Sequence, residues 1–335
     1  MLAGMTAMTR RLGRSGLSVS ALGMGCWAIG GPFWDGDQPR GWGEVDDAES
    51  ERAIGRALDL GVTFFDTADT YGTGHSERVL GQALGGRRDE VVIATKWGNT
   101  FDEATRQKTG SDGSPGYVRA AVEASLRRLG TDRIDLYQLH IGDLPIPRAE
   151  VLLGTLEDLV TEGKIRWYGW STDAPERAEA WGKDGVHCTA VQHSLSVFEN
   201  NAAAMLDVCD RYDLGSINRA PLAMGLLTGK FTADSTLAPD DIRALAPDWL
   251  VFFRDGRPAS EWLDRVAAVR EILTSDGRTL AQGALGWIWA RSDRTVPIPG
   301  CRTVAQVEEN AGALHHGPIS AAAAAEIDRI LTPPQ

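Results

Sequence analysis

The sequence predicts a single (β/α)₈ barrel, because eight short apolar runs alternate with amphipathic segments of helical periodicity. A length of 335 residues fits one such barrel. Three of the apolar runs end in an ionisable residue, as expected at the carboxyl-terminal rim where barrel enzymes keep their sites. An open, doubly wound sheet is the alternative fold, since the number of strands alone does not show that the sheet closes.

The same patterns place the elements along the chain. Strands are expected at residues 21–24, 63–66, 90–96, 134–140, 165–171, 190–193, 216–221 and 295–299. Helices are expected at residues 46–60, 76–84, 115–129, 148–162, 175–181, 201–212, 260–274, 280–290 and 303–314. The third helix carries its own boundaries, because Ser114 can cap it, Pro115 suits its first turn and Gly130 can end it.

The two ends of the chain fall outside this alternation. Residues 11–20 contain a Ser15-Gly16 turn between alternating residues, which predicts a small hairpin that plugs the bottom of the barrel. Residues 1–9 are expected to be flexible, and residues 320–335 to form a C-terminal helix and tail. The whole chain, residues 1–335, is therefore predicted to be one domain.

Two connections are longer than the usual loops of such folds, and both follow the carboxyl end of an expected strand. They span residues 97–114 and 230–259. We expect them to be lids or walls of a substrate pocket, with disordered surface insertions as the alternative. The second contains Phe231, Trp249, Phe252 and Phe253, which favours some burial.

Composition narrows the classes of partner. The formal net charge of −12 predicts a surface that repels nucleic acid and anionic lipid. The cysteines lie far apart without metal-ligand spacing, so reduced thiols and no metal site are expected at Cys26, Cys188, Cys209 and Cys301. No apolar run approaches the ~20 residues of a membrane span, and the first residues lack the apolar stretch of a signal peptide. A cytoplasmic protein is the expectation, with the number of subunits left open.

Four side chains at strand ends carry the chemistry. Asp66, Lys96 and His140 each close an apolar run, and Tyr71 follows Asp66 by five residues. Taken alone, each has an ordinary structural interpretation: a turn-capping aspartate, a solvated lysine, a satisfied histidine. Their joint placement at one rim favours a catalytic role.

These residue types suit protonation of a carbonyl oxygen. A lysine ammonium beside Tyr71 is expected to lower the pKa of the phenol, and Asp66 to keep Lys96 in place and charged. His140 can donate a hydrogen bond that orients a carbonyl oxygen. The set contains no source of hydride, so a reductase of this kind requires a cofactor.

At this point the chain resembles the aldo-keto reductase family over residues 10–314. The matching motifs are Phe65-Asp66-Thr67-Ala68 with Tyr71-Gly72, Ala94-Thr95-Lys96, Leu139-His140, Gly225-Leu226-Leu227-Thr228-Gly229-Lys230, and Ile298-Pro299-Gly300 with Arg302, Gln306 and Glu309-Asn310. The resemblance implies a catalytic tetrad of Asp66, Tyr71, Lys96 and His140. It also implies an NADP(H) cofactor bound in an extended form without a Rossmann fold.

The resemblance also implies cofactor-binding residues. Ser171, Thr172 and Gln192 match the positions beside the nicotinamide carboxamide, with Gly25, Cys26 and Trp27 at the end of the first barrel strand and Asp66 nearby. The loop over the pyrophosphate matches Ala220, Pro221, Leu222, Gly225, Leu227 and Lys230. Gly300 and Arg302 match the site of the 2′-phosphate, and Gln306, Glu309 and Asn310 that of the adenosine. Arg302 also precedes a helix N-terminus, where backbone amides favour anions.

Three positions depart from the family pattern. Leu195 stands where an aromatic ring usually stacks on the nicotinamide, and Thr172 replaces an asparagine. Arg219 takes a place before Ala220-Pro221 that often holds an aromatic residue, and we predict that it contacts the cofactor pyrophosphate. Gly23-Met24-Gly25-Cys26-Trp27-Ala28 formally matches a dinucleotide fingerprint, but no helix follows it directly.

Three functions remain to be compared: an NADPH-dependent carbonyl reductase, a nucleotide-binding regulatory protein with little turnover, and an aldolase using Lys96 as a Schiff base. The reductase is favoured over the aldolase because the aldolase leaves Tyr71, Asp66 and Arg302 without roles. It is favoured over the regulatory protein because the four acid/base residues are intact. The substrate pocket is expected to draw on Trp27, Trp34, Tyr71, Trp97, Tyr117, His140 and the 230–259 loop. Apolar carbonyl compounds and sugars both suit such a lining.

Overall fold

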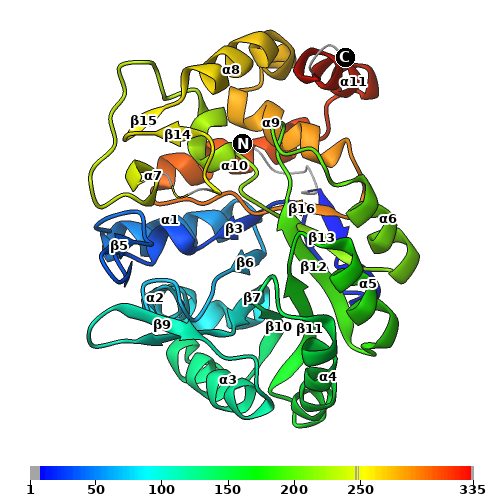
Figure 1. Cartoon of the computed structure of the whole chain (residues 1–335). Helices are drawn as coiled ribbons and strands as arrows, with labels where there is room; N and C mark the ends of the chain where they lie inside the picture. Colours follow the sequence, from blue (N-terminus) through cyan, green and yellow to red (C-terminus); the bar gives the residue numbers. More distant parts are fainter. Residues whose placement is uncertain (1–7, 246, 248, 333–335) are drawn as a thin grey trace.

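Eight parallel strands form the central sheet, in the order β16-β13-β12-β11-β10-β7-β6-β3. A computed structural model describes residues 8–245, 247 and 249–332, and Figure 1 shows the strands surrounded by helices. The strands are β3 (Gly23–Gly25), β6 (Phe64–Asp66), β7 (Val92–Trp97), β10 (Ile134–Leu139), β11 (Ile165–Ser171), β12 (Cys188–Ser194), β13 (Gly215–Arg219) and β16 (Thr295–Pro297).

The sheet closes between its first and last strands. The amide of Gly25 donates to the carbonyl of Pro299 at 3.0 Å, and Gly25 forms a parallel bridge with Gly300. Gly25 permits this approach, because a Cβ there would lie 2.7 Å from the carbonyl oxygen of Ile298. The predicted (β/α)₈ barrel is therefore confirmed over the open sheet.

Helices follow the strands and cover the outside of the barrel. They are α1 (Asp47–Asp59), α2 (His75–Leu84), α3 (Pro115–Leu129), α4 (Ile146–Thr161), α5 (Pro175–Asp184), α6 (Ala203–Tyr212), α7 (Ile242–Leu245), α8 (Ser260–Leu273), α9 (Leu280–Trp289), α10 (Val304–His316) and α11 (Ala321–Leu331). The predicted ends of α3 are confirmed: the Ser114 side chain accepts from the Tyr117 amide, and Gly130 is left-handed.

Alternation along each strand divides the core into two parts. Side chains that point inward fill the barrel, among them Phe64, Val92, Leu136 and Ile217. The next residue along a strand points outward into the layer shared with the helices, where Tyr137 is fully buried. This alternation decides which residues near the strand ends can face the site.

The predicted N-terminal hairpin is confirmed as a plug. Its strands are β1 (Thr9–Arg11) and β2 (Ser18–Ser20), which pair antiparallel. Leu12 and Val19 belong to the interior cluster of the barrel. The Leu12 carbonyl accepts a 2.8 Å hydrogen bond from Thr189 at the start of β12, so the hairpin closes the amino-terminal end.

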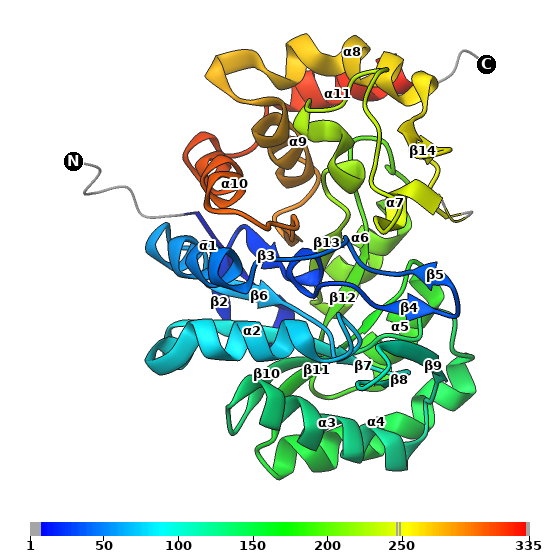
Figure 2. The ribbon, with the colours of Figure 1, turned by 90° about the vertical axis from the view of Figure 1, so that its left-hand side faces the viewer.

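The loop at 97–114 forms an ordered hairpin, β8 (Asn99–Asp102) with β9 (Gln107–Ser111). It joins the short strands β4 (Trp34–Asp35) and β5 (Gln38–Pro39) in a four-stranded sheet of order β5-β4-β9-β8. Figure 2 shows this sheet at the right and β2 at the left, at opposite ends of the barrel. The connection is thus structured rather than an irregular insertion.

The described part of the 230–259 loop is also structured, with α7, β14 (Phe253–Arg254) and β15 (Arg257–Pro258). The expected burial of its aromatic residues holds for Phe252 and Phe253, which are 2% and 3% exposed. It is wrong for Trp249, which is 53% exposed. Burial depends here on which side of the loop faces the barrel, which composition does not reveal.

Candidate active site

Four titratable side chains meet at the carboxyl-terminal end of the barrel. The Lys96 ammonium lies 2.5 Å from Asp66 Oδ1, donates to the Thr67 carbonyl at 2.8 Å and reaches the Tyr71 hydroxyl at 3.2 Å. The rings of Tyr71 and His140 meet edge to face, with centroids 5.9 Å apart. The structure therefore brings together the three residues expected at strand ends and Tyr71 from the loop after Asp66.

The barrel geometry explains this convergence. Asp66 ends β6, Lys96 stands one residue before the end of β7, and His140 directly follows β10. These strands are neighbours in the sheet, so their ends share one rim. Tyr71 reaches the rim from a tight turn after β6. Gly72 in this turn has a φ of +58°, and a Cβ there would lie 1.7 Å from the Gly30 carbonyl oxygen, so the turn requires glycine.

Lys96 is a buried cation held by its neighbours. Its side chain is fully buried, which opposes the charge, but Asp66 and Tyr71 outweigh that effect and raise the pKa of Lys96 above its ordinary value. Lys96 therefore remains an ammonium beside the Tyr71 hydroxyl.

The pKa of Tyr71 was expected to be lowered, and this expectation is wrong for the net shift. Burial raises the pKa of Tyr71 above its ordinary value, and Lys96 offsets only part of that rise. Tyr71 is consequently protonated at neutral pH. A protonated phenol next to a fixed cation is a proton donor whose conjugate base has a counter-ion in place.

His140 is a neutral ring at the same point. Burial, followed by the charges of Lys96, Arg219 and Lys108, holds the pKa of His140 well below its ordinary value of 6.5. Its Nδ1 atom is covered and has no hydrogen-bond partner in the described part of the chain. A neutral imidazole can donate one hydrogen bond to a carbonyl oxygen, and it does not compete with Tyr71 as an acid.

Two amides complete the surroundings of Asp66. Gln138 and Gln192 donate to Asp66 Oδ2 at 3.1 and 2.8 Å. Sequence reasoning gave Gln192 a place at the cofactor but missed Gln138. The alternation of side chains along a strand could have identified Gln138, because it lies two residues before His140 and so shares its face.

The aromatic wall beside Tyr71 differs from the expected one. Trp27 stacks on Tyr71 with centroids 5.9 Å apart, and Trp42, which was not expected, packs edge-on against Trp27 at 5.3 Å. Trp34 lies partly buried in β4. Trp97 does not line the pocket: it is fully buried and stacks on Tyr137 in the outer layer. The reason is alternation, since Lys96 points inward and the next residue must point outward.

The segment after β13 has an unusual backbone. Ala220, Ala223, Met224 and Gly225 all have positive φ. The amides of Ala223 and Gly225 donate within the segment, to the carbonyls of Ala220 and Leu222 at 2.9 and 3.0 Å. Non-glycine residues in this conformation are strained and cluster at functional sites. The guanidinium of Arg243, a residue that sequence reasoning missed, is buried and donates to the Met224 carbonyl at 3.1 Å.

Two basic residues, Lys230 and Arg302, and the N-terminus of α10 lie on the chain after this loop. Lys230 follows the loop, and burial, then the charge of Arg243, lowers its pKa. Arg302 donates to the carbonyls of Trp42 and Glu44 at 2.9 and 2.6 Å. Its own amide donates to Gln306 at 2.8 Å, just before α10.

Arg219 points to the rim from the end of β13. It donates to Ser194 Oγ at 2.7 Å and is paired with the carboxylate of Asp173. Its charge acts on both Tyr71 and His140, which places it close to the reacting groups.

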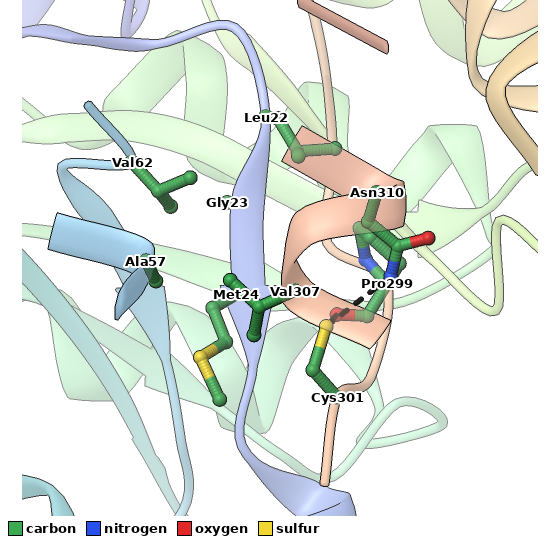
Figure 3. A pocket seen from close by; sticks show the side chains of 9 residues that line it. All are labelled: Leu22, Gly23, Met24, Ala57, Val62, Pro299, Cys301, Val307 and Asn310. Atoms are coloured by element: carbon green, nitrogen blue, oxygen red, sulfur yellow. Dashed lines mark hydrogen bonds between the residues drawn. The ribbon is translucent and has the colours of Figure 1, made fainter. Parts of the chain in front are cut away.

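Of the positions expected at the adenosine, Asn310 is packed into the wall, whereas Gln306 and Glu309 are partly buried. Asn310 is 5% exposed and donates to the Cys301 sulfur at 3.2 Å. Both residues line a small apolar cavity between β3, α1 and α10 (Figure 3). The Glu309 carbonyl accepts from Gln282.

The other expected cofactor residues end barrel strands or follow them, at the same end of the barrel as Tyr71. They are Gly25, Cys26, Ser171, Thr172, Pro221, Leu222, Leu227 and Gly300.

Comparison with known proteins agrees with this geometry. Residues 21–332 match the model of the aldo/keto reductase family. The chain belongs to that family. It is 31% identical over 320 residues to aldo-keto reductase yakc [NADP(+)] of Schizosaccharomyces pombe, covering 92% of this chain and 87% of the relative.

Solved aldo-keto reductases share the whole fold. The glycerol dehydrogenase of Gluconobacter oxydans superposes with a TM-score of 0.80 at 27% identity, covering 99% of this chain and 98% of the other. An aldo-keto reductase of Klebsiella pneumoniae in complex with NADPH gives 0.69 at 28% identity, covering 99% and 97%.

Membranes and metal ions are the remaining points. Among the described residues, none of the helices combines the length and the apolar character that a membrane span requires. Residues 8–245, 247 and 249–332 contain no cluster of three or more His, Cys, Asp or Glu side chains that could hold a metal ion. All four cysteines are buried and free.

Proposed function

We propose that this aldo/keto reductase uses NADP(H) to reduce aldehyde or ketone carbonyls to alcohols, with Tyr71 as the proton donor. The observation that carries the proposal is the contact of the Tyr71 hydroxyl with the buried Lys96 ammonium at 3.2 Å. The names of the yeast relative and of the Klebsiella complex support NADP(H) as the cofactor.

The residues present fit such a cofactor. A pyrophosphate at the loop of residues 220–225 would meet two cations. Arg219 directly precedes the loop, and Lys230 Cε lies 3.8 Å from where a Cβ on Gly225 would stand. Arg302 precedes α10, and its guanidinium would pair with a phosphate there. The Val304 and Gln306 amides at this helix start already donate to Glu49 and Thr303. Gln192 and Ser171 would hold the carboxamide. When bound, the cofactor supplies hydride to the carbonyl carbon.

The protein's own groups manage the oxygen and its proton. A carbonyl oxygen placed between the Tyr71 hydroxyl and His140 accepts hydrogen bonds from both. As negative charge develops on that oxygen, the Tyr71 hydroxyl transfers its proton, and the Lys96 ammonium stabilises the phenolate left behind. Asp66 fixes Lys96, and Gln138 and Gln192 fix Asp66.

The aldolase alternative fits poorly, because a Schiff base needs a neutral amine. Asp66 and Tyr71 hold Lys96 in its charged form. The regulatory alternative shares the fold and the cofactor, so only turnover separates it from a reductase.

Replacing Tyr71 by phenylalanine tests the proposal. We expect Tyr71→Phe to lower kcat by about 10²- to 10⁴-fold, because it removes the proton donor and little else. NADPH binding, followed by fluorescence titration, should be unchanged. Wild-type activity is measured as NADPH oxidation with a panel of aldehydes, ketones and sugar-derived carbonyls.

Two results would contradict the proposal. Undiminished turnover by Tyr71→Phe would exclude the proposed donor. Wild-type protein that binds NADPH but reduces no carbonyl of the panel would favour the regulatory protein.

A further inference from the structure

A buried ion cluster lies outside the barrel wall, next to the turn that carries Tyr71. Its centre is Glu77 of α2, whose side chain is fully buried. One carboxylate oxygen accepts from the Thr95 hydroxyl at 2.6 Å, and the other accepts from Arg128 of α3 at 2.7 Å. Thr95 directly precedes Lys96, so the cluster adjoins the catalytic strand without contributing to the proton chemistry.

Arg128 also packs against the Tyr71 turn itself. Gly74 in that turn has a φ of +93°, and a Cβ on it would lie 2.6 Å from Arg128 Cδ. The guanidinium is likewise one of the charges acting on Asp69, a buried carboxyl in the same turn. The Arg128 side chain therefore lies against the Gly74 end of the turn, and its charge acts on Asp69.

The same guanidinium reaches the β8–β9 hairpin. Glu103, in the bend between the two strands, accepts from Arg128 Nη1 at 3.1 Å and is also paired with Arg78 of α2. The ring of Phe101 lies 5.7 Å from the guanidinium carbon of Arg128. One side chain thus touches the turn on one side and the hairpin on the other.

The hairpin adjoins the strand end that carries His140. Its first strand, β8, starts two residues after Trp97, whose carbonyl accepts from the His140 amide at 2.7 Å. A Cβ on the intervening Gly98 would lie 2.8 Å from the side chain of Ile141, the residue after His140. The charge of Lys108 in β9 also acts on His140. A shift of this hairpin would therefore change the space next to His140.

We propose that Arg128 is a positioning residue that locks the β8–β9 hairpin against the Tyr71 turn and so sets the carbonyl-binding pocket. This inference rests on the proposed function for what the pocket binds. Arg128 acts through the hairpin and touches neither substrate nor cofactor. A planar fork suits the task, because it can bind Glu77 and Glu103 at the same time, which a lysine ammonium does less well.

The test uses two variants that spare the fold and one matched control. Glu103→Gln removes the hairpin carboxylate that Arg128 and Arg78 share. Glu103 is 43% exposed and Arg128 keeps its pair with Glu77, so no buried charge is left unpaired. Arg128→Lys keeps the charge next to Glu77 but loses the fork. Arg119→Lys is the control, because Arg119 also lies on α3 and binds two carboxylates, Asp158 and Glu162, each at 2.7 Å.

Amide exchange and steady-state kinetics are measured together on the full chain. We expect both test variants to speed exchange within residues 99–111 by about tenfold, as local opening becomes easier. KM for the carbonyl should rise by about tenfold, with kcat and the Kd of NADPH within about twofold of wild type. Arg119→Lys should change none of these.

The outcomes separate the lock from a general structural role. Unchanged hairpin exchange in Glu103→Gln and Arg128→Lys overturns the inference. Equal losses of carbonyl and NADPH affinity, or the same losses in Arg119→Lys, also overturn it, because they indicate general loosening. If the wild type reduces no carbonyl, the proposed function fails, and the exchange data alone decide whether the lock exists.

Discussion

Tyr71 sets the expected pH dependence. Burial raises its pKa despite Lys96, so the phenol stays protonated well above neutrality, and His140 is neutral because its pKa lies well below 6.5. We expect kcat for reduction to be flat between about pH 6 and 8 and to fall only as the pH rises through the pKa of Tyr71. Alcohol oxidation needs the phenolate and should increase over that upper range.

The measurement is kcat at saturating NADPH, or NADP⁺ for the reverse direction, across a pH series. Tyr71→Phe, assayed at high enzyme concentration, is the control for cofactor breakdown. A loss of reduction centred near pH 6.5, the ordinary pKa of histidine, would instead identify a protonated His140 as the donor.

Arg219 offers a second prediction at this scale. If its guanidinium contacts the cofactor pyrophosphate, Arg219→Ala should weaken NADPH binding by about tenfold, as expected for a lost charged hydrogen bond. It should also flatten the salt dependence of binding. Asp173 shares the guanidinium, so Asp173→Asn should strengthen binding. Fluorescence titration at several salt concentrations decides; unchanged affinity and salt dependence in Arg219→Ala would exclude the contact.

Single residues could be predicted where a strand determines their direction. Strand ends alone placed Lys96 and His140 correctly, and alternation would have added Gln138. Alternation also shows why Trp97 was misplaced, because the neighbour of an inward lysine points outward. The net pKa of Tyr71 could not be predicted, since it depends on how completely the folded chain covers the ring.

At the scale of elements, Arg243 supports the loop after β13. Its guanidinium pairs with Asp241, donates to the Met224 carbonyl and lies 4.6 Å from the ring of Trp42. Arg243→Lys should release the positive-φ loop and raise the Kd of NADPH by about tenfold, while kcat at saturating cofactor stays near wild type. Arg254→Lys is the control, because Arg254 lies in the same long loop but is exposed and pairs with Glu261. Equal NADPH affinity in both variants would show that Arg243 does not support the loop.

Elements were predictable where their contacts are local. The helix α3 carries its own cap and stop signal, and its bounds agree with the expectation. The β8–β9 hairpin was expected only as a long loop, because its partner strand β4 lies about seventy residues earlier and pairs through Trp34 and Gln107 alone. Such short, distant pairing leaves no periodic signal in the sequence.

At the scale of the whole molecule, the two ends of the barrel have different tasks. The reacting groups lie at the carboxyl-terminal rim, whereas the N-terminal hairpin fills the opposite end with Leu12 and Val19. The number of strands did not show whether the sheet is open or closed. The hydrogen bond from Gly25 to Pro299 shows that it is closed, and this bond joins segments near the two ends of the chain. Contacts of that range follow from packing rather than from local pattern.

This division predicts that the hairpin contributes stability and not catalysis. Leu12 is fully buried, so Leu12→Ala leaves a cavity and should lower the free energy of unfolding by roughly 2–5 kcal/mol. Because the cavity lies at the end of the barrel away from Tyr71, kcat/KM of the folded enzyme should be unchanged. Leu17→Ala is the control, since Leu17 is only partly buried and should cost less. Urea unfolding and steady-state kinetics on the same preparations decide the matter: a Leu12→Ala protein with wild-type stability but reduced kcat/KM would show that the plug acts on the site.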